Sequence, residues 1–579
     1  MTDLRVALLS SCTMEVFERP FAGALRQRGY TPSFWTSGYG QYQRDILDET
    51  SGVYRHDPNV VVLHLDGEDL FREMLQNPLA TLAEARRAQA KQAAGQVTSL
   101  VETLSARLPK ALIILNTTAV APLNALTGLE YNSEYGTHDA LDDYNRSIAA
   151  FANENAGVAV VDAAGLAATM GFERWRDSRM WYLARLRHSR QALEALAERY
   201  AATIGAHLGR IRKCIALDLD NTLWGGIIGE DGFEGIKLGE ESIGLAFAEF
   251  QQELLNLYRK GVLLALCSKN NPQDALQVIR ERPGMRLREE HFAAVRINWE
   301  DKASNLRALA GELNIGLDSF VFIDDNPVER TWVRQSAPEV LVPEWPADPV
   351  EYKSSLLGLS AEHFLKLRIT AEDRKRGEIY QAQAARRKLE GSGSSLEEFY
   401  RALEMRARIG RANAFTIPRI AQLTQKTNQF NLTTRRYTEA EIRAASADEY
   451  TEVFWLELTD RFGPSGIVGV LILKEDAGAV WNVDTFLLSC RVMGRTVENA
   501  FLAVAAREVG ASRLRGEYLP TAKNAPVKDL YQRLGFERIH GPDDDRLWML
   551  DDAVARLEVP PWFEVTVERE AARAGVAKS

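Results

Sequence analysis

The chain of 579 residues exceeds what one hydrophobic core sustains, so we expect roughly three or four domains. Hydrophobic residues make up 46% and charged residues 26%, a composition typical of folded proteins and not of disordered ones. The formal net charge of −10 argues against nucleic acid or an anionic membrane surface as a partner, because both require clustered Lys and Arg.

The four cysteines lie far apart and form no C-x-x-C pair, so neither a disulfide framework nor a zinc knuckle is predicted. The first residues, "MTDLRVALLSSCTMEVF", lack the pattern of a signal peptide, and no apolar run reaches the length of about 20 residues that a membrane helix needs. These features predict a cytoplasmic protein.

Residues 1–205 alternate short apolar runs with longer amphipathic stretches. This alternation predicts an α/β domain with a parallel sheet. The predicted strands are "LRVALLSSC", "NVVVLHLDG", "ALIILNTTA" and "GVAVVDAAG".

Four further segments follow. Residues 211–360 repeat the alternation, with strands predicted at "KCIALDLD", "GVLLALCSK", "FAAVRIN", "SFVFIDD" and "EVLVPEW". Residues 361–395 are charged and helical in pattern and end in "GSGSS", which has the composition of a flexible linker. Residues 396–555 hold strands close in sequence, which predicts antiparallel pairing in an α+β domain, and we interpret 556–579 as a tail.

Polar side chains gather at the predicted strand ends of the second block. Asp218 and Asp220 end its first strand, and strand alternation gives them the same facing. Two carboxylates there repel each other unless a cation or a shared proton relieves the charge. Ligands bind at the carboxyl edge of such sheets, and Mg²⁺ prefers oxygen ligands.

Four more groups reach the same edge. Ser268 ends the second strand, Lys302 follows the third, and Asp324 and Asp325 end the fourth. Together with Asp218 and Asp220 they predict a site for phosphate and magnesium, in which one carboxylate attacks phosphorus and the other protonates the leaving group.

"DLDNT", the strand-final serine, the lysine and the strand-final "DD" resemble the four motifs of the haloacid dehalogenase (HAD) superfamily. The resemblance implies Asp218 as nucleophile, Asp220 as acid/base, and Thr222, Ser268 and Lys302 as phosphate-binding residues. It also implies Mg²⁺ held by Asp218, the main-chain carbonyl of Asp220, and Asp324 with Asp325. Only 45 residues separate Thr222 from Ser268, which leaves no room for a large cap domain and suits a macromolecular or carrier-borne substrate.

Longer stretches resemble the FkbH-like proteins of polyketide biosynthesis: "DLDNTLWGGIIGEDG", "LALCSKNN", "FIDDNPVER", "QLTQKTNQFNLTTRRY" and "LLSCRVMGRTVE". That resemblance implies a glyceryl transferase/phosphatase. Such an enzyme dephosphorylates 1,3-bisphosphoglycerate and passes the glyceryl group through an enzyme thioester to the phosphopantetheine thiol of a holo-acyl carrier protein. Two other hypotheses stay open: a plain phosphatase, and a carrier-binding or acetylating protein.

Acyl transfer through the enzyme needs a thiol near the phosphate site. Cys267 precedes Ser268, although alternation allows its side chain to pack into the core instead. Cys490 is the second candidate for the thiol that carries the acyl group, and a mechanism that uses neither thiol is the third alternative. Cys214 lies at the start of its strand, which is the wrong end.

The two outer domains also resemble known folds. Around Cys490 the chain resembles a GNAT acyltransferase, whose pyrophosphate-binding loop is matched loosely by Arg491, Gly494 and Arg495, residues that would then bind a carrier or CoA arm. The amino-terminal domain resembles an SGNH hydrolase of flavodoxin type, with "SSCT" in place of the usual G-D-S. That resemblance implies a site of Ser10, Ser11, Gly67, Asn116 and His188. The domain's role is left open between a scaffold on one side and hydrolysis or thioester editing on the other.

Overall fold

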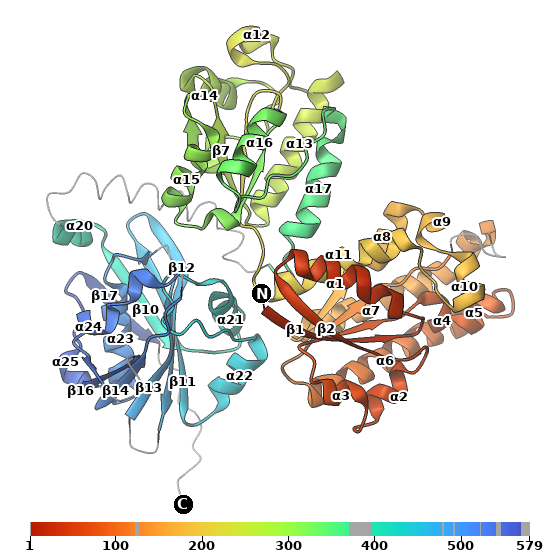
Figure 1. Cartoon of the computed structure of the whole chain (residues 1–579), viewed down its shortest axis with the longest axis horizontal. Coiled ribbons are helices and arrows are strands. Elements are labelled where there is room, and N and C mark those ends of the chain that lie inside the picture. The colour runs from red at the N-terminus through yellow and green to blue at the C-terminus, as the bar shows by residue number, and fades with distance from the viewer. Residues whose placement is uncertain are drawn as a thin grey trace, which may run out of the picture. The chain divides into compact units, whose positions relative to one another are not determined.

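The computed structural model describes residues 2–121, 127–369, 382, 396–476, 480–489, 492–521, 523–539 and 546–568. The chain divides into two compact units, Met1–Arg210 and Ile211–Ser579, and the second unit contains two separate sheets (Figure 1). No described helix is both long enough and apolar enough to cross a bilayer.

The first unit is built on a five-stranded sheet of order β2-β1-β3-β4-β5 in which all pairs are parallel. Its strands are β1 (Thr2–Ser10), β2 (Tyr30–Thr36), β3 (Val60–His64), β4 (Leu112–Asn116) and β5 (Val158–Val161). The parallel α/β prediction is confirmed. The sequence prediction missed β2, since Pro32 and its polar neighbours resemble a loop, and a strand with proline is tolerated at this edge.

Helices cover both faces of this sheet. One face packs on α1 (Glu18–Gln27), α8 (Ala163–Met170) and α11 (Arg190–His207), and the other on α6 (Ala83–Arg107) and α7 (Thr137–Glu154). The shorter helices are α2 (Tyr42–Leu47), α3 (Gly52–His56), α4 (Gly67–Leu70), α5 (Arg72–Gln76), α9 (Phe172–Trp175) and α10 (Ser178–Ala184).

The second sheet is also parallel, with order β8-β7-β6-β9. Its strands are β6 (Cys214–Leu217), β7 (Leu263–Ser268), β8 (Phe292–Ile297) and β9 (Phe320–Ile323), and the fifth predicted strand is reduced to one bridge between Leu341 and Val321. The helices are α12 (Ile228–Gly235), α13 (Ser242–Arg259), α14 (Pro272–Glu281), α15 (Lys302–Leu313), α16 (Pro327–Ser336) and α17 (Tyr352–His363). Helices α13, α14 and α17 cover one face, and α15 and α16 cover the other.

The third sheet has the order β15-β16-β14-β13-β12-β11-β10-β17. Its strands are β10 (Met405–Arg411), β11 (Thr451–Asp460), β12 (Gly463–Glu475), β13 (Val480–Leu488), β14 (Arg513–Glu517), β15 (Glu537–Arg538), β16 (Leu547–Asp551) and β17 (Phe563–Glu568). Its helices are α20 (Leu396–Ala402), α21 (Ile417–Lys426), α22 (Glu439–Ala447), α23 (Val497–Glu508), α24 (Leu530–Arg533) and α25 (Ala553–Arg556). Pairing is antiparallel from β10 to β13, as predicted, and β13 pairs in parallel with β14.

The predicted tail and the predicted linker have different outcomes in the structure. The segment interpreted as a tail, 556–579, contains β17, which pairs in parallel with β10, so the tail prediction was wrong there. The alternation "FEVTVE" was the overlooked strand signal. Most of the predicted linker 361–395, including "GSGSS", lies outside the described residues.

Strands β13 and β14 pair only between Val480–Val483 and Arg513–Gly516, and the chain itself fills the gap beyond. The Leu432 N–H donates to the Phe486 carbonyl and the Leu488 N–H to the Phe430 carbonyl, which seats residues 430–432 on the free edge of β13. On their other side, the Leu519 N–H donates to the Leu432 carbonyl. We call residues 430–432 the strap.

Candidate active site

The carboxyl ends of three strands of the second sheet lie at the same level. Leu217 of β6 is in register with Leu266 of β7 and Ile323 of β9, so the residues after these positions converge. Asp218 follows β6, is almost fully buried, and its N–H donates to the Ile323 carbonyl over 3.0 Å. This register brings Asp218 to the predicted acid pair after β9.

Lys302 joins the two acidic positions. It is the first residue of α15, whose preceding residue Asp301 caps the helix by accepting from the Ser304 N–H. The Lys302 ammonium donates to Asp218 Oδ1 over 2.8 Å and also to Asp324 Oδ2. Burial alone would lower the pKa of Lys302, but Asp218 and Asp324 outweigh it and hold the pKa above its usual value.

Three carboxylates lie close together at the carboxyl edge of the second sheet. Asp218, Asp324 and Asp325 each offer an oxygen, and these oxygens lie within 4.8 Å of one another. Burial, reinforced by the charge of Asp218, raises the pKa of Asp324 to about 7 and that of Asp325 to about 6. Clustered carboxylate oxygens that resist ionisation together suit a hard divalent cation such as Mg²⁺.

Asp220 is held apart from this cluster. Its Oδ1 accepts from the Trp224 indole N–H over 2.9 Å and the Ile228 N–H over 3.1 Å, and its Oδ2 accepts from the Asn270 amide over 2.8 Å. Burial raises the pKa of Asp220, which favours a proton donor. The sequence did not predict these contacts of Trp224 and Asn270, although both residues lie within the FkbH-like stretches "DLDNTLWGGIIGEDG" and "LALCSKNN".

The predicted phosphate-binding residues have different roles in the structure. The Thr222 hydroxyl is buried and accepts from the Asp325 N–H over 3.2 Å, so it orders the loop after β9. The Ser268 side chain is also buried but makes no hydrogen bond within the described part of the chain, which leaves its hydroxyl available to a ligand.

Arg330 is a further positioning residue that the sequence prediction missed. Its Nη1 donates to the carbonyls of Asp324 over 2.9 Å and Asp325 over 2.6 Å, which fixes the loop that carries both acids. It lies six residues after Asp324, within the FkbH-like stretch "FIDDNPVER", but the sequence did not predict a role for it.

The two described thiols of the second unit, Cys267 and Cys214, do not line this site. Cys267 is fully buried in the core cluster under α15, its Sγ lies 3.6 Å from the Lys302 carbonyl, and burial holds its pKa above the usual value. Cys214 is buried in the same cluster at the start of β6. Cys490 and Arg491 lie outside the described residues.

Of the residues predicted to bind an arm, the two described ones, Gly494 and Arg495, contact the protein itself. Arg495 is buried and forms an ion pair of 3.1 Å with Asp460, and the Gly494 carbonyl accepts from the Tyr400 hydroxyl over 2.8 Å. Glu498, buried in the first turn of α23, places a carboxylate where a pyrophosphate would need positive potential.

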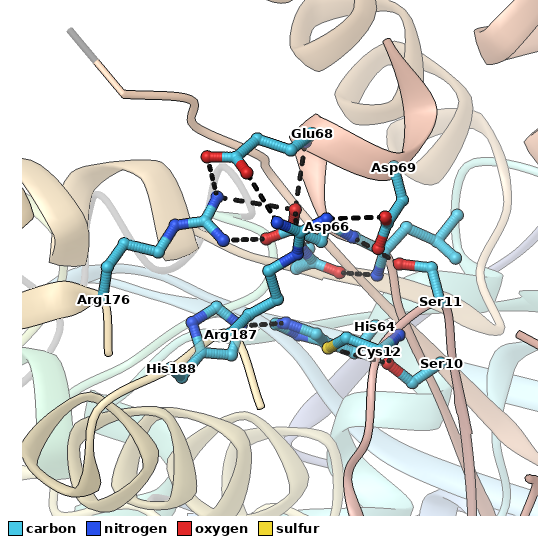
Figure 2. Close-up of polar contacts among 12 residues, drawn as sticks. Ser10, Ser11, Cys12, His64, Asp66, Glu68, Asp69, Arg176, Arg187 and His188 are labelled. Atoms are coloured by element: carbon cyan, nitrogen blue, oxygen red, sulfur yellow. Dashed lines mark hydrogen bonds and ion pairs between the residues drawn. The ribbon is translucent and has the colours of Figure 1, made fainter. Parts of the chain in front are cut away.

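Ser10, Ser11 and His188 lie at the carboxyl edge of the first sheet (Figure 2), and the Ser11 N–H donates to the His64 carbonyl over 3.2 Å. In the described part of the chain, neither serine hydroxyl is hydrogen-bonded to a histidine ring. Ser10 Oγ accepts from the Cys12 N–H, and Ser11 Oγ accepts from the Asp66 N–H. Instead, His188 Nε2 lies 2.9 Å from His64 Nε2.

The remaining two candidates there have structural contacts. The Asn116 side chain accepts from the Leu65 N–H and donates to the Leu65 carbonyl, so its amide is occupied by the backbone. Gly67 begins α4 where a Cβ would lie 2.7 Å from Thr118 Oγ1, so only glycine fits. The described geometry lacks the serine–histidine contact of a hydrolase.

A parallel sheet whose strand ends gather Asp218, Lys302 and the Asp324–Asp325 pair defines a HAD-like phosphatase domain. The N-terminal part of BF1531 from Bacteroides fragilis, described as containing a phosphatase domain and complexed with Mg, is 30% identical, with a TM-score of 0.59 over 64% of this chain and 95% of that chain. The protein belongs to the same family as BF1531.

Two further solved structures match smaller parts. One is described as an acetyltransferase of the GNAT family from Desulfovibrio desulfuricans, with 16% identity and a TM-score of 0.20 over 25% of this chain and 98% of that chain. The other is the lipase Lip_vut3 from a goat rumen metagenome, with 14% identity and a TM-score of 0.27 over 35% and 97%. No protein-family model and no curated protein matches the chain.

Proposed function

We propose that the protein is a Mg²⁺-dependent phosphatase of the HAD type that acts at Asp218. The observation that carries this proposal is the ammonium of Lys302 bridging Asp218 and Asp324 beside Asp325. Asp218, Asp324 and Asp325 are the residues that would hold the ion. Mg²⁺ supplies charge neutralisation for a phosphoryl group there.

The chain's own residues account for the chemistry. An Asp218 oxygen attacks phosphorus, forming an aspartyl phosphate as the bond to the leaving oxygen breaks. Asp220, with its raised pKa, gives its proton to that leaving oxygen and then takes one from the water that hydrolyses the aspartyl phosphate. Lys302 and the Ser268 hydroxyl hold the phosphoryl oxygens.

The finer proposal is glyceryl transfer. We infer from the FkbH-like stretches that the donor is 1,3-bisphosphoglycerate and that the glyceryl group passes to the phosphopantetheine thiol of a holo-acyl carrier protein in polyketide-type biosynthesis. The short connection between Asp220 and β7, which holds only α12 and α13, supports an open site for such a partner. In this proposal the SGNH-like and GNAT-like domains serve as scaffold and docking surface.

A plain phosphatase is the second candidate, and the position of Cys267 favours it. This thiol packs in the core on the face that α15 covers, so an acyl group reaches it only if β7 or α15 moves. Among the described residues of the second unit no other cysteine lies near Asp218, and the transfer proposal therefore depends on Cys267 becoming exposed or on Cys490.

Mass spectrometry separates the candidates. The full chain is incubated with 1,3-bisphosphoglycerate, Mg²⁺ and a holo-carrier protein, and both proteins are weighed. Transfer predicts a glyceryl adduct on the enzyme and then on the carrier. The enzyme adduct is lost in either Cys267→Ala or Cys490→Ala, whichever thiol carries the thioester, and is kept in the matched variant Cys214→Ala. Phosphate release without any adduct supports the plain phosphatase, and no phosphate release contradicts both.

A further inference from the structure

A cluster of a thiol and two imidazoles lies in the first unit, outside the phosphatase site (Figure 2). Cys12 follows β1, His64 ends β3 and His188 precedes α11, so three distant segments meet at one point. All three side chains are buried, with exposures of 2%, 1% and 7%. The phosphatase reaction proposed above uses none of them.

The ligand atoms of the cluster face one another. One sulfur or ring-nitrogen atom from each of Cys12, His64 and His188 lies within 4.8 Å of the other two. Around a tetrahedral zinc ion, with Zn–S near 2.3 Å and Zn–N near 2.0 Å, ligand atoms lie about 3.3 to 3.8 Å apart. The two Nε2 atoms, 2.9 Å apart, need to separate by only a few tenths of an ångström to admit an ion.

A hydrogen bond to the Tyr200 hydroxyl orients the imidazole of His64 for metal binding. His64 Nδ1 lies 2.9 Å from the Tyr200 hydroxyl, which turns Nε2 toward the cluster, the arrangement typical of metal-binding histidines. His188 Nδ1 is buried without a hydrogen-bond partner in the described structure, so protein contacts alone leave this ring incompletely satisfied.

The charged groups beside the cluster are matched in number. Asp66, Glu68 and Asp69 form ion pairs with Arg176 and Arg187, and Arg72 also pairs with Asp69. Three carboxylates and three guanidinium groups leave no net charge there. The attraction for a cation therefore comes from the ligands themselves, one thiolate and two neutral imidazoles.

We propose that Cys12, His64 and His188 bind one Zn²⁺ ion that ties the ends of β1 and β3 to the segment before α11. On binding, the Cys12 S–H bond breaks, its proton leaves to solvent, and the sulfur forms the Zn–S bond. Sulfur and imidazole ligands favour zinc over magnesium. The carboxylate cluster around Asp218, by contrast, suits magnesium. Three protein ligands leave the fourth position to water or a nearby oxygen.

Metal content and a spectroscopic probe test this site. The full chain, produced with Zn²⁺ and dialysed, is expected to retain about one zinc ion per chain by elemental analysis. Cys12→Ser and His188→Gln are expected to lose most of it, whereas Cys214→Ser, which changes a buried thiol without neighbouring histidines, keeps it. Asp218→Asn also keeps the zinc, which separates this site from the phosphatase site.

Cobalt replaces zinc as the probe. Co²⁺ added to the metal-free wild-type chain is expected to give the intense near-ultraviolet band of a thiolate–cobalt bond, and Cys12→Ser to lack it. Equal zinc in wild type and Cys12→Ser, or a saturated wild type without the thiolate band, would overturn the proposal. The wild-type spectrum decides even if the variants fold poorly.

Discussion

Lys302 is the residue on which the electrostatics of the phosphatase site depend. It neutralises two buried carboxylates, and it sits at the first position of α15, where the cap formed by Asp301 fixes the start of the helix. A lysine with two acidic partners stays charged, so its role is to hold negative phosphoryl oxygens and not to exchange protons.

Replacing Lys302 with methionine is expected to lower phosphate release by about 10²- to 10³-fold, because a buried electrostatic donor is lost. Mg²⁺ is expected to raise the thermal midpoint of Lys302→Met more than that of wild type, since Asp218 and Asp324 then lack a partner. Thermal unfolding with and without Mg²⁺ measures this. Lys353→Met, which changes an exposed ion pair, should behave as wild type, and an equal Mg²⁺ shift in Lys302→Met and wild type would contradict the role assigned to Lys302.

At the scale of elements, the start of α15 is set by the Asp301 cap. Hydrogen bonds from Ser304, with a further one from the Trp332 indole, hold the pKa of Asp301 at about 2, below its usual value of about 3.9. Because the folded pKa is the lower one, the stabilisation is complete above the usual pKa and is lost as pH falls toward 2.

Asp301→Ala is therefore expected to destabilise the protein by about 1 kcal/mol at neutral pH, the usual cost of removing an N-cap. Asp301→Asn keeps a cap oxygen but does not titrate, so its urea midpoint should approach that of wild type as the pH falls from 4 to 2. A difference between Asp301→Asn and wild type that stays constant over that range would contradict the titration of Asp301.

The strap, residues 430–432, closes the opening in the third sheet where a GNAT enzyme would bind acetyl-CoA. Since residues 430–432 hydrogen-bond to β13 and to Leu519, the opening between β13 and β14 is occupied by the chain itself. The Asn524 amide adds a bond to the Asn431 carbonyl over 3.0 Å. Acetyl-CoA is accordingly expected neither to bind nor to be consumed, as measured by calorimetry and thiol release. Saturable binding of acetyl-CoA would show that the strap moves aside.

For the whole molecule, the sequence predicted most of the fold because the signals were local. Buried strands alternating with amphipathic helices indicated both parallel sheets, and the strand-final acids converge at the carboxyl edge, as their positions predicted. The edge strands β2 and β17 were not predicted from the sequence. Their residues are half exposed and include proline or charged side chains, so these strands lack the continuous apolar run of a buried strand.

The sites could be predicted only in part, because side-chain direction is a tertiary property. Asp218, Lys302 and Asp324 meet as their strand positions implied, whereas the direction of Cys267 depends on the packing of α15 against β7. The cluster of Cys12, His64 and His188 joins residues up to 176 positions apart that form no recognisable motif. Only the folded chain brings them together.

Phosphate release by the full chain, with Mg²⁺ and an acyl phosphate, tests directly whether Asp218 is the nucleophile. Wild type is compared with Asp218→Asn and with the control Asp274→Asn on the exposed first turn of α14. We expect Asp218→Asn to abolish release while the chain still unfolds cooperatively, and Asp274→Asn to retain wild-type activity. An Asp218→Asn chain that turned over at the wild-type rate would contradict the assignment of Asp218 as the nucleophile.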